Sequence, residues 1–220
     1  MKISKGNMAM MIILAIIIID QCLKIWVKTN FFLGEDYPIT SWFHLKFIEN
    51  NGMAFGLELW DKLVLTIGRI IAVILFIIFI IKIKDNKQLR TGFLISIALI
   101  TAGAAGNIFD CIFYGKIFNS PYGFELATFM PHDGGYANWF EGKVVDMLYF
   151  PLFSFDLPNW IPIIGGKNYE FFQYIFNIAD SAICIGVFLL IFFYSKDVND
   201  AIQSLKSNKT DSDKIIDINK

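Results

Sequence analysis

Long apolar runs alternate with polar segments along this chain of 220 residues, and the runs decide the predicted architecture. A helix needs about 20 residues to cross about 30 Å of hydrocarbon, because each residue adds about 1.5 Å. Four runs reach this length, so we expect four transmembrane helices. They cover residues 8–27, 63–81, 91–113 and 172–194.

The two longer connections differ in pattern. The connection at 28–62 carries apolar, aromatic and β-branched residues up to an Asn-Asn-Gly sequence, which predicts a short strand and a turn. The connection at 114–171 is rich in Pro and Gly and should be irregular. The predicted fold class is therefore a membrane all-α domain at 1–194 with a small β part, a strand and loop subdomain outside the membrane.

Composition narrows the class of protein further. Hydrophobic residues make up 55% of the chain and 23 residues are Phe, which is typical of an integral membrane protein. The net charge of −1 leaves no basic excess for nucleic acid, so we exclude nucleic acid as a partner. Three Cys without CxxC spacing are expected to be small buried side chains, and two isolated His predict no metal site.

The distribution of basic residues predicts the orientation, since Lys and Arg in short loops stay in the cytoplasm. Four of them lie between the second and third runs, and two Lys precede the first run. We therefore expect both termini in the cytoplasm, the two long connections outside, and a flexible cytoplasmic tail at 195–220. The first run also resembles a cleaved signal peptide, but Asp20 and Gln21 before Cys22 do not suit a cleavage site, so we expect an uncleaved helix.

Five ionisable side chains interrupt the apolar runs. They are Asp20, Lys24, Arg69, Asp110 and Asp180. A charge at the centre of a membrane helix costs roughly 2.5 to 3.5 kcal/mol on insertion scales, so such side chains usually mark a functional site. With the predicted orientation, the three aspartates lie toward the outer leaflet at similar depth, where a bundle of four helices can bring them together.

The two basic residues of this set each allow two interpretations. Asp20 and Lys24 are spaced i, i+4 and can pair on one helix face. Such a pair either neutralises itself against the bundle, or binds a substrate headgroup or anchors the outer subdomain. Arg69, early in the second run, either extends toward the outer surface or contacts a substrate carbonyl or phosphate.

The pattern Asn-Ile-x-Asp occurs twice, as Asn107 with Asp110 and as Asn177 with Asp180. Hydrogen bonding between helices is the simpler explanation, but its typical gain of about 0.6 kcal/mol does not by itself justify two acids in a membrane. Two carboxylates within a few ångströms cannot both ionise readily, so one holds a proton while the other draws a proton from water. That is the equipment for hydrolysing an amide, and the sequence contains no competing GxSxG, HExxH or Cys/His pattern.

Together these residues resemble the lipoprotein signal peptidases, the signal peptidase II family of bacterial membranes. Five blocks in the family's order carry the resemblance: DQCLK, NNGMAF, AGAAGNIFD, KVVDM and FNIADSAICIG. The resemblance implies an intramembrane aspartic peptidase with Asp146 and Asp180 as its catalytic dyad. It implies substrate-binding or supporting roles for a second group: Asp20, Lys24, Asn50, Gly52, Asn107, Asp110 and Asn177.

The resemblance also implies a substrate and a location. The substrate is a prolipoprotein that carries diacylglycerol on the cysteine after its signal peptide, and cleavage falls just before that cysteine. The enzyme lies in the bacterial cytoplasmic (inner) membrane with its active site toward the outer face, and globomycin, a cyclic peptide, should inhibit it. We expect no cofactor, a monomer, and the lipid bilayer as the second partner.

Two departures from the family's pattern need an explanation. The family usually has Arg after the aspartate of the GNxxD block, where this chain has Cys111, and Arg69 or Lys143 is the candidate replacement. The segments 119–141 and 150–170 lengthen the second outer connection. The stretch HDGGYANWF, within 119–141, either forms a lid or a docking surface, or merely rests on the membrane, and the role of 150–170 stays open.

Two other function classes stay open at this point. A small proton- or cation-coupled carrier also places acids in a membrane cavity, but it should have access to both sides and often paired broken helices. A lipoprotein-binding scaffold without catalysis would not need both aspartates.

Overall fold

A computed structural model of the chain describes residues 3–51, 62–121, 123–162 and 165–218. The chain divides into two compact units, which we treat separately. Unit 1 consists of Met1–Ile18, Gly68–Gly106 and Ala179–Lys220, and unit 2 consists of Ile19–Ile67 and Asn107–Ile178.

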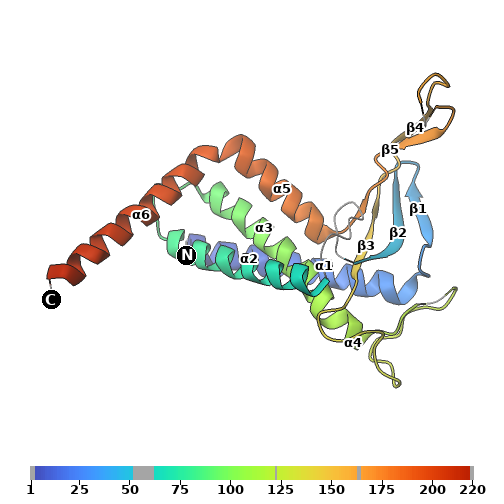
Figure 1. The fold of residues 1–220 in the computed structure, drawn as a ribbon, viewed down its shortest axis with the longest axis horizontal. Helices are drawn as coiled ribbons and strands as arrows, with labels where there is room; N and C mark the ends of the chain where they lie inside the picture. Colours follow the sequence, from blue (N-terminus) through green and yellow to red (C-terminus); the bar gives the residue numbers. More distant parts are fainter. Residues whose placement is uncertain (1–2, 52–61, 122, 163–164, 219–220) are drawn as a thin grey trace. The chain divides into compact units, whose positions relative to one another are not determined.

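Helices dominate the described residues, which confirms the predicted membrane all-α fold with a small β part (Figure 1). Three stretches are long and apolar enough to cross a membrane, namely Lys5–Asn30, Leu63–Ile83 and Thr91–Ile117. A fourth span results if two helices that meet at 87° are counted as one. The helices are α1 (Lys5–Asn30), α2 (Lys62–Ile83), α3 (Thr91–Phe109), a π-helical segment (Asp110–Tyr114), α4 (Gly115–Ile117), α5 (Ile178–Phe193) and α6 (Ser195–Ile218).

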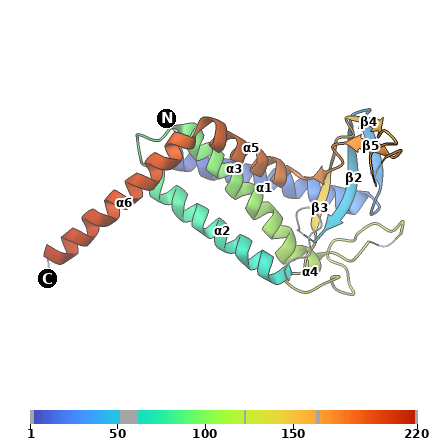
Figure 2. The same cartoon turned by 45° about the horizontal axis from the view of Figure 1, so that its top comes forward.

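The last predicted membrane helix differs from the structure at its start. Helix α5 begins at Ile178, whereas the apolar pattern predicts a helix from residue 172. The difference arises because Ile175–Phe176 forms strand β6, which pairs with β3. Beyond α5 the chain turns into α6, so the backbone of the predicted tail is helical, and its flexibility stays a prediction (Figure 2).

Helices α3 and α5 of unit 1 approach closely at glycines. A Cβ atom on Gly103 would lie 2.2 Å from the carbonyl oxygen of Ala179, and one on Gly186 would lie 2.6 Å from that of Ser96. Small residues allow such close backbone packing between membrane helices. Gly103 lies in a stretch of small residues at 102–106, which is the sequence feature that permits this approach.

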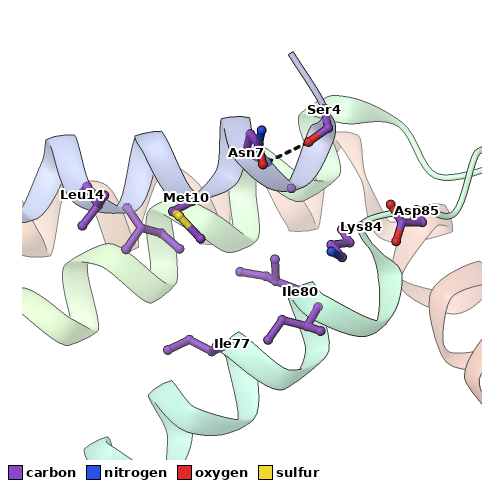
Figure 3. Close-up of a pocket in the computed structure, with 11 residues that line it drawn as sticks. Ser4, Asn7, Met10, Leu14, Ile77, Ile80, Lys84 and Asp85 are labelled. Atoms are coloured by element: carbon purple, nitrogen blue, oxygen red, sulfur yellow. Dashed lines mark hydrogen bonds between the residues drawn. The ribbon is translucent and has the colours of Figure 1, made fainter. Parts of the chain in front are cut away.

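Unit 1 also contains a cavity of about 310 Å³ between α1 and α2 (Figure 3). Apolar side chains such as Met10, Leu14 and Ile77 line most of it, and Asn7 and Lys84 lie at one end. None of the described residues that line this cavity belongs to the predicted site.

Unit 2 contains an antiparallel sheet with strand order β1-β2-β3-β6. Where the sequence predicts one strand and a turn, the structure has a hairpin of two strands. A separate pair of strands, β4 and β5, covers the two ends of the segment predicted to be an insertion at 150–170, and β5 continues one residue beyond it. The strands not yet given are β1 (Asp36–Thr40), β2 (Phe43–Asn50), β3 (Val144–Tyr149), β4 (Phe153–Asp156) and β5 (Asn168–Phe171).

Candidate active site

Asp146 lies at the centre of unit 2, on strand β3, whose six residues are all buried. Its side chain accepts two amide hydrogen bonds, one on each carboxylate oxygen. Asn50 Nδ2 donates to Oδ2 at 2.8 Å, and Asn177 Nδ2 donates to Oδ1 at 2.7 Å. Because Asn50 ends β2 and Asn177 lies between β6 and α5, two neighbouring elements fix the orientation of this carboxylate.

A chain of hydrogen bonds connects Asp146 with a buried lysine. The Asn177 amide, besides its bond to Asp146, donates to Asn107 Oδ1 at 3.1 Å. The same Asn107 oxygen accepts a hydrogen bond from Lys24 Nζ at 2.8 Å. Two amide side chains therefore separate the ammonium group from the Asp146 carboxylate.

Lys24 is fully buried and has three oxygen acceptors for its three hydrogens. In addition to Asn107, its Nζ atom lies 2.8 Å from Asp20 Oδ2 and 2.7 Å from Asp110 Oδ2. The predicted pairing of Asp20 with Lys24 is therefore confirmed. Asp110 joins it from a different segment, which makes a buried cluster of two acids and one base.

Asp110 links this cluster to strand β3. Its Oδ1 atom accepts a hydrogen bond from Gln21 Nε2 at 2.8 Å, and its Oδ2 atom accepts one from the backbone N–H of Val145 at 3.3 Å. Val145 directly precedes Asp146. Asp110 is also the first residue of the π-helical segment, and such segments occur frequently at functional sites.

The end of the 119–141 insertion packs against this π-helical segment, which the sequence did not indicate. The carbonyl of Ile112 accepts a hydrogen bond from Phe140 N at 3.3 Å, and the carbonyl of Cys111 accepts one from Gly142 N, just after the insertion, at 2.8 Å. A Cβ atom on Gly142 would lie only 2.1 Å from the Asp110 carbonyl oxygen. Only glycine allows this approach, so the residue that follows the insertion packs directly against the backbone of Asp110, while the role of the insertion itself stays a prediction.

A second buried lysine was missed by the sequence reasoning. Lys28 lies one helical turn after Lys24, is fully buried, and forms an ion pair with Glu49 on β2. Three aromatic rings surround its ammonium group at 5.2 to 5.7 Å from their centroids: Phe47, Phe118 and Tyr136. Its i, i+4 spacing from Lys24 was the available signal.

The two candidates to replace the family's arginine occupy different places. Lys143 Nζ lies 3.3 Å from Glu49 Oε2, so this lysine extends the Lys28 cluster. Arg69 lies half-buried on α2 in unit 1. Cys111 is 1% exposed, directly after Asp110.

The remaining predicted residues are not brought to Asp146 by unit 2 itself. Asp180 lies half-buried in the first turn of α5, which belongs to unit 1. Its pairing with Asp146 stays a prediction. Gly52 lies outside the described residues. Within those residues, no group of three His, Cys, Asp or Glu side chains is arranged to hold a metal ion.

Comparison with known proteins identifies the family. The family model "Signal peptidase (SPase) II" matches residues 12–196. A lipoprotein signal peptidase of Porphyromonas gingivalis is 41% identical over 206 residues, which cover 94% of this chain and 91% of the relative. One from Amoebophilus asiaticus is 38% identical over 210 residues, covering 92% and 84%.

A solved structure described as a bacterial membrane enzyme is similar to this chain with a TM-score of 0.56. Its sequence is 26% identical, and the match covers 84% of this chain and 90% of that one. It supports the fold that the family model and the two relatives indicate. With the match extending from residue 12 to residue 196, the chain belongs to the signal peptidase II family.

Proposed function

We propose that this chain is an aspartic endopeptidase that removes the signal peptide from diacylglyceryl-modified prolipoproteins and cuts just before the lipidated cysteine. Family membership and the names of the relatives support the substrate class. The observation that carries the chemistry is the buried carboxylate of Asp146, held at both oxygens by Asn50 and Asn177.

In the proposed mechanism, Asp146 and Asp180 share one proton. The ionised carboxylate removes a proton from water, the resulting hydroxide attacks the scissile carbonyl, and the protonated partner transfers its proton to the carbonyl oxygen, which gives a gem-diol. The partner, now ionised, then takes a proton from one gem-diol hydroxyl. The C–N bond breaks as the departing nitrogen takes the proton that the first aspartate removed from water, which restores the starting dyad.

The hydrogen-bond chain behind Asp146 suits this role. A lysine in direct contact would favour the ionised carboxylate and oppose the proton uptake that the cycle requires. Here Asn107 and Asn177 lie between Lys24 and Asp146, and both groups that contact the Asp146 side chain through Nδ2 are neutral amides. The amides therefore orient the carboxylate while the full positive charge stays one step further away.

The predicted location completes the proposal. The enzyme lies in the bacterial cytoplasmic membrane as a monomer, with both termini in the cytoplasm and the dyad toward the outer face. The basic connection between α2 and α3 supports this orientation. Family membership argues against the carrier and scaffold alternatives.

The test is to replace the two aspartates separately. Purified Asp146→Asn and Asp180→Asn variants should each cleave a diacylglyceryl-modified prolipoprotein about 10²- to 10⁴-fold more slowly than the wild type, measured by gel shift. Asp133→Asn is the matched control, because this exposed aspartate lies in the 119–141 insertion. Wild-type cleavage by either dyad variant would remove that aspartate from the mechanism.

Inhibitor binding separates loss of chemistry from loss of fold. Globomycin should still bind variants that fold but cannot cleave. The Arg69→Ala and Lys143→Ala variants, assayed in the same way, decide which basic residue serves in place of the family's arginine. If cleavage is unchanged in both, neither residue has that role.

A further inference from the structure

The hairpin formed by β4 and β5 has one aromatic face and one polar face. Cross-strand pairs place Phe153 opposite Phe171 and Phe155 opposite Tyr169. The rings of Phe153 and Phe171 stack with their centroids 4.7 Å apart. Because side chains alternate along a strand, the pairs between them lie on the opposite face. Those alternate pairs are Ser154 with Glu170 and Asp156 with Asn168.

The polar face is tied to the main sheet of unit 2. The hydroxyl of Tyr149, at the end of β3, donates a hydrogen bond to Glu170 Oε2 at 2.5 Å. Burial and this carboxylate raise the pKa of Tyr149 to about 12, so the hydroxyl stays a donor at neutral pH. The hairpin extends beyond β3 (Figure 1), and its four aromatic side chains are each between 42% and 56% exposed.

The loop between the two strands is apolar in sequence, which is unusual for the tip of a hairpin in water. It reads LPNWIPIIGGK, with one charged residue at its end, and the Trp160 side chain is 79% exposed. In the part of the loop that the structure describes, Gly166 N donates a hydrogen bond to Leu157 O at 2.8 Å and Gly165 N donates one to Ile161 O at 3.0 Å. Backbone groups that are paired in this way lose less free energy when they leave water.

A hairpin of two strands is marginally stable alone in water, and a patch of exposed aromatic rings needs a partner. The bilayer is the partner that fits best. Trp and Tyr concentrate at membrane–water interfaces, where their rings contact apolar matter and their polar atoms stay hydrated. The chain returns from β5 through β6 directly into the apolar helix α5, so the hairpin lies on the segment that enters the membrane.

We propose that the β4–β5 hairpin is a membrane-interface anchor. Its aromatic face and Trp160 lie among the lipid headgroups and upper acyl chains of the leaflet where α5 begins. Glu170 and the rest of the polar face remain toward the protein and water. The anchor holds the end of β3, the strand that carries Asp146, against the bilayer through the Tyr149–Glu170 hydrogen bond. It does not depend on the peptidase chemistry.

The test measures the environment of Trp160 by fluorescence in the full chain. The protein is reconstituted in phosphatidylcholine vesicles with and without bromine on the acyl chains, and the emission of the Trp160→Phe variant is subtracted from that of the wild type. We expect bromine to quench most of the difference emission, which belongs to Trp160. Acrylamide, which stays in water, should quench little of it.

Two further variants test the face itself. The Phe153→Ser/Phe171→Ser variant should move Trp160 from bromine quenching to acrylamide quenching. Ser154→Ala/Asn168→Ala, the matched change on the polar face, should leave both unchanged. Quenching of wild-type Trp160 by acrylamide alone would overturn the proposal. Quenching by neither agent would also overturn it, because a second copy or another protein would then cover the face.

Discussion

Lys24 and Lys28 are one turn apart on α1, both are fully buried, and their surroundings are opposite in character. Lys24 is coordinated by oxygen atoms from two acids and an amide. Lys28 has one carboxylate partner, Glu49, and three aromatic rings. The same residue type therefore serves two purposes within one helix of unit 2.

The difference indicates which cluster belongs to the chemistry. Moving an ammonium group out of water costs several kcal/mol even in real proteins, so both sites need compensation. At Lys24 the compensation comes from two carboxylates and an amide, and the amide belongs to the hydrogen-bond chain that reaches Asp146. At Lys28 it comes from a single ion pair and from rings, which attract a desolvated cation by about 2 kcal/mol. We infer that the Lys24 cluster positions the carboxylate of Asp146, the proposed catalytic residue, and that the Lys28 cluster fastens β2 to the segments around it.

Replacing Lys24 should have the largest effect. Lys24→Met leaves the Asp20 and Asp110 carboxylates close together without their shared cation, and removing one partner of a buried ion pair costs about 3 to 5 kcal/mol. We expect a strongly lowered unfolding temperature in detergent and loss of cleavage. Lys87→Met, a matched change at an exposed lysine, should have almost no effect. A Lys24→Met variant as stable as the wild type would contradict the comparison.

Asn177 tests the link between the Lys24 cluster and Asp146. Asn177→Leu removes the amide that donates to Asp146 and Asn107, and leaving buried acceptors without this donor costs about 1 to 3 kcal/mol. If the cost falls on the orientation of the carboxylate, kcat falls roughly 10- to 100-fold. KM should change less. Asn138→Leu, at an exposed amide, is the control, and a change in KM alone would argue for substrate binding at Asn177.

Lys28→Met should have a smaller effect than Lys24→Met. Lys143 still accompanies Glu49, and a methionine side chain packs favourably against the three rings, so we expect a loss of about 1 to 2 kcal/mol in unfolding free energy. Cleavage should persist. The Lys28→Met/Glu49→Gln variant should regain part of that loss, because it removes a buried charge that the partly exposed Lys143 compensates only in part. Equal losses of unfolding free energy in the Lys24→Met and Lys28→Met variants would show that the oxygen atoms around Lys24 and the rings around Lys28 stabilise their ammonium groups to the same extent.

These two clusters also show what the sequence could and could not predict. The Asp20–Lys24 pair follows from its spacing, and the shared faces of Asn107 and Asp110 follow from theirs. Asp146 was identified from the resemblance, because the residues of a buried strand do not reveal which partners they meet. The Lys28–Glu49 pair was missed, since a lysine near the end of an apolar run is ordinarily expected to extend into water.

The strands were harder to predict than the helices. Residues 172–176 are mostly apolar and aromatic, and a short run of this kind fits a strand as well as a helix. The pairing with β3 makes residues 175–176 a strand, and β3 lies far from them in the sequence, so the sequence pattern does not reveal this pairing. The β4–β5 hairpin was missed for a related reason. Its strands have four residues each, too few for alternation to stand out among Pro and Gly.

The smallest effect is expected at the ion pair between Arg90 and Asp197 in unit 1, in which only the arginine is exposed. The Arg90 guanidinium lies 2.6 Å from Asp197 Oδ2, as close as the contacts of Lys24, but the Arg90 side chain is 56% exposed, against 6% for Asp197, so water screens the pair from the arginine side. Burial raises the pKa of Asp197, but the hydrogen bonds and charge of Arg90 outweigh it, so the pKa is lowered. A lowered pKa stabilises the fold above the usual aspartate value of about 3.9, and that contribution is lost as the pH falls through the folded-state value.

Asp197→Asn should therefore lower the unfolding temperature slightly at pH 7, by less than Lys28→Met does. The difference from the wild type should shrink in high salt. It should also shrink as the pH falls below about 4, where the unfolded-state carboxylate takes up a proton, and disappear once the pH lies below the lowered folded-state pKa, where the wild-type carboxylate is neutral as well. Thermal unfolding at a series of pH values measures this directly. A difference that persists unchanged at pH 3 would mean that packing at Asp197, and not its charge, provides the stability. The short contact distance would then not reflect a strong ion pair at this site.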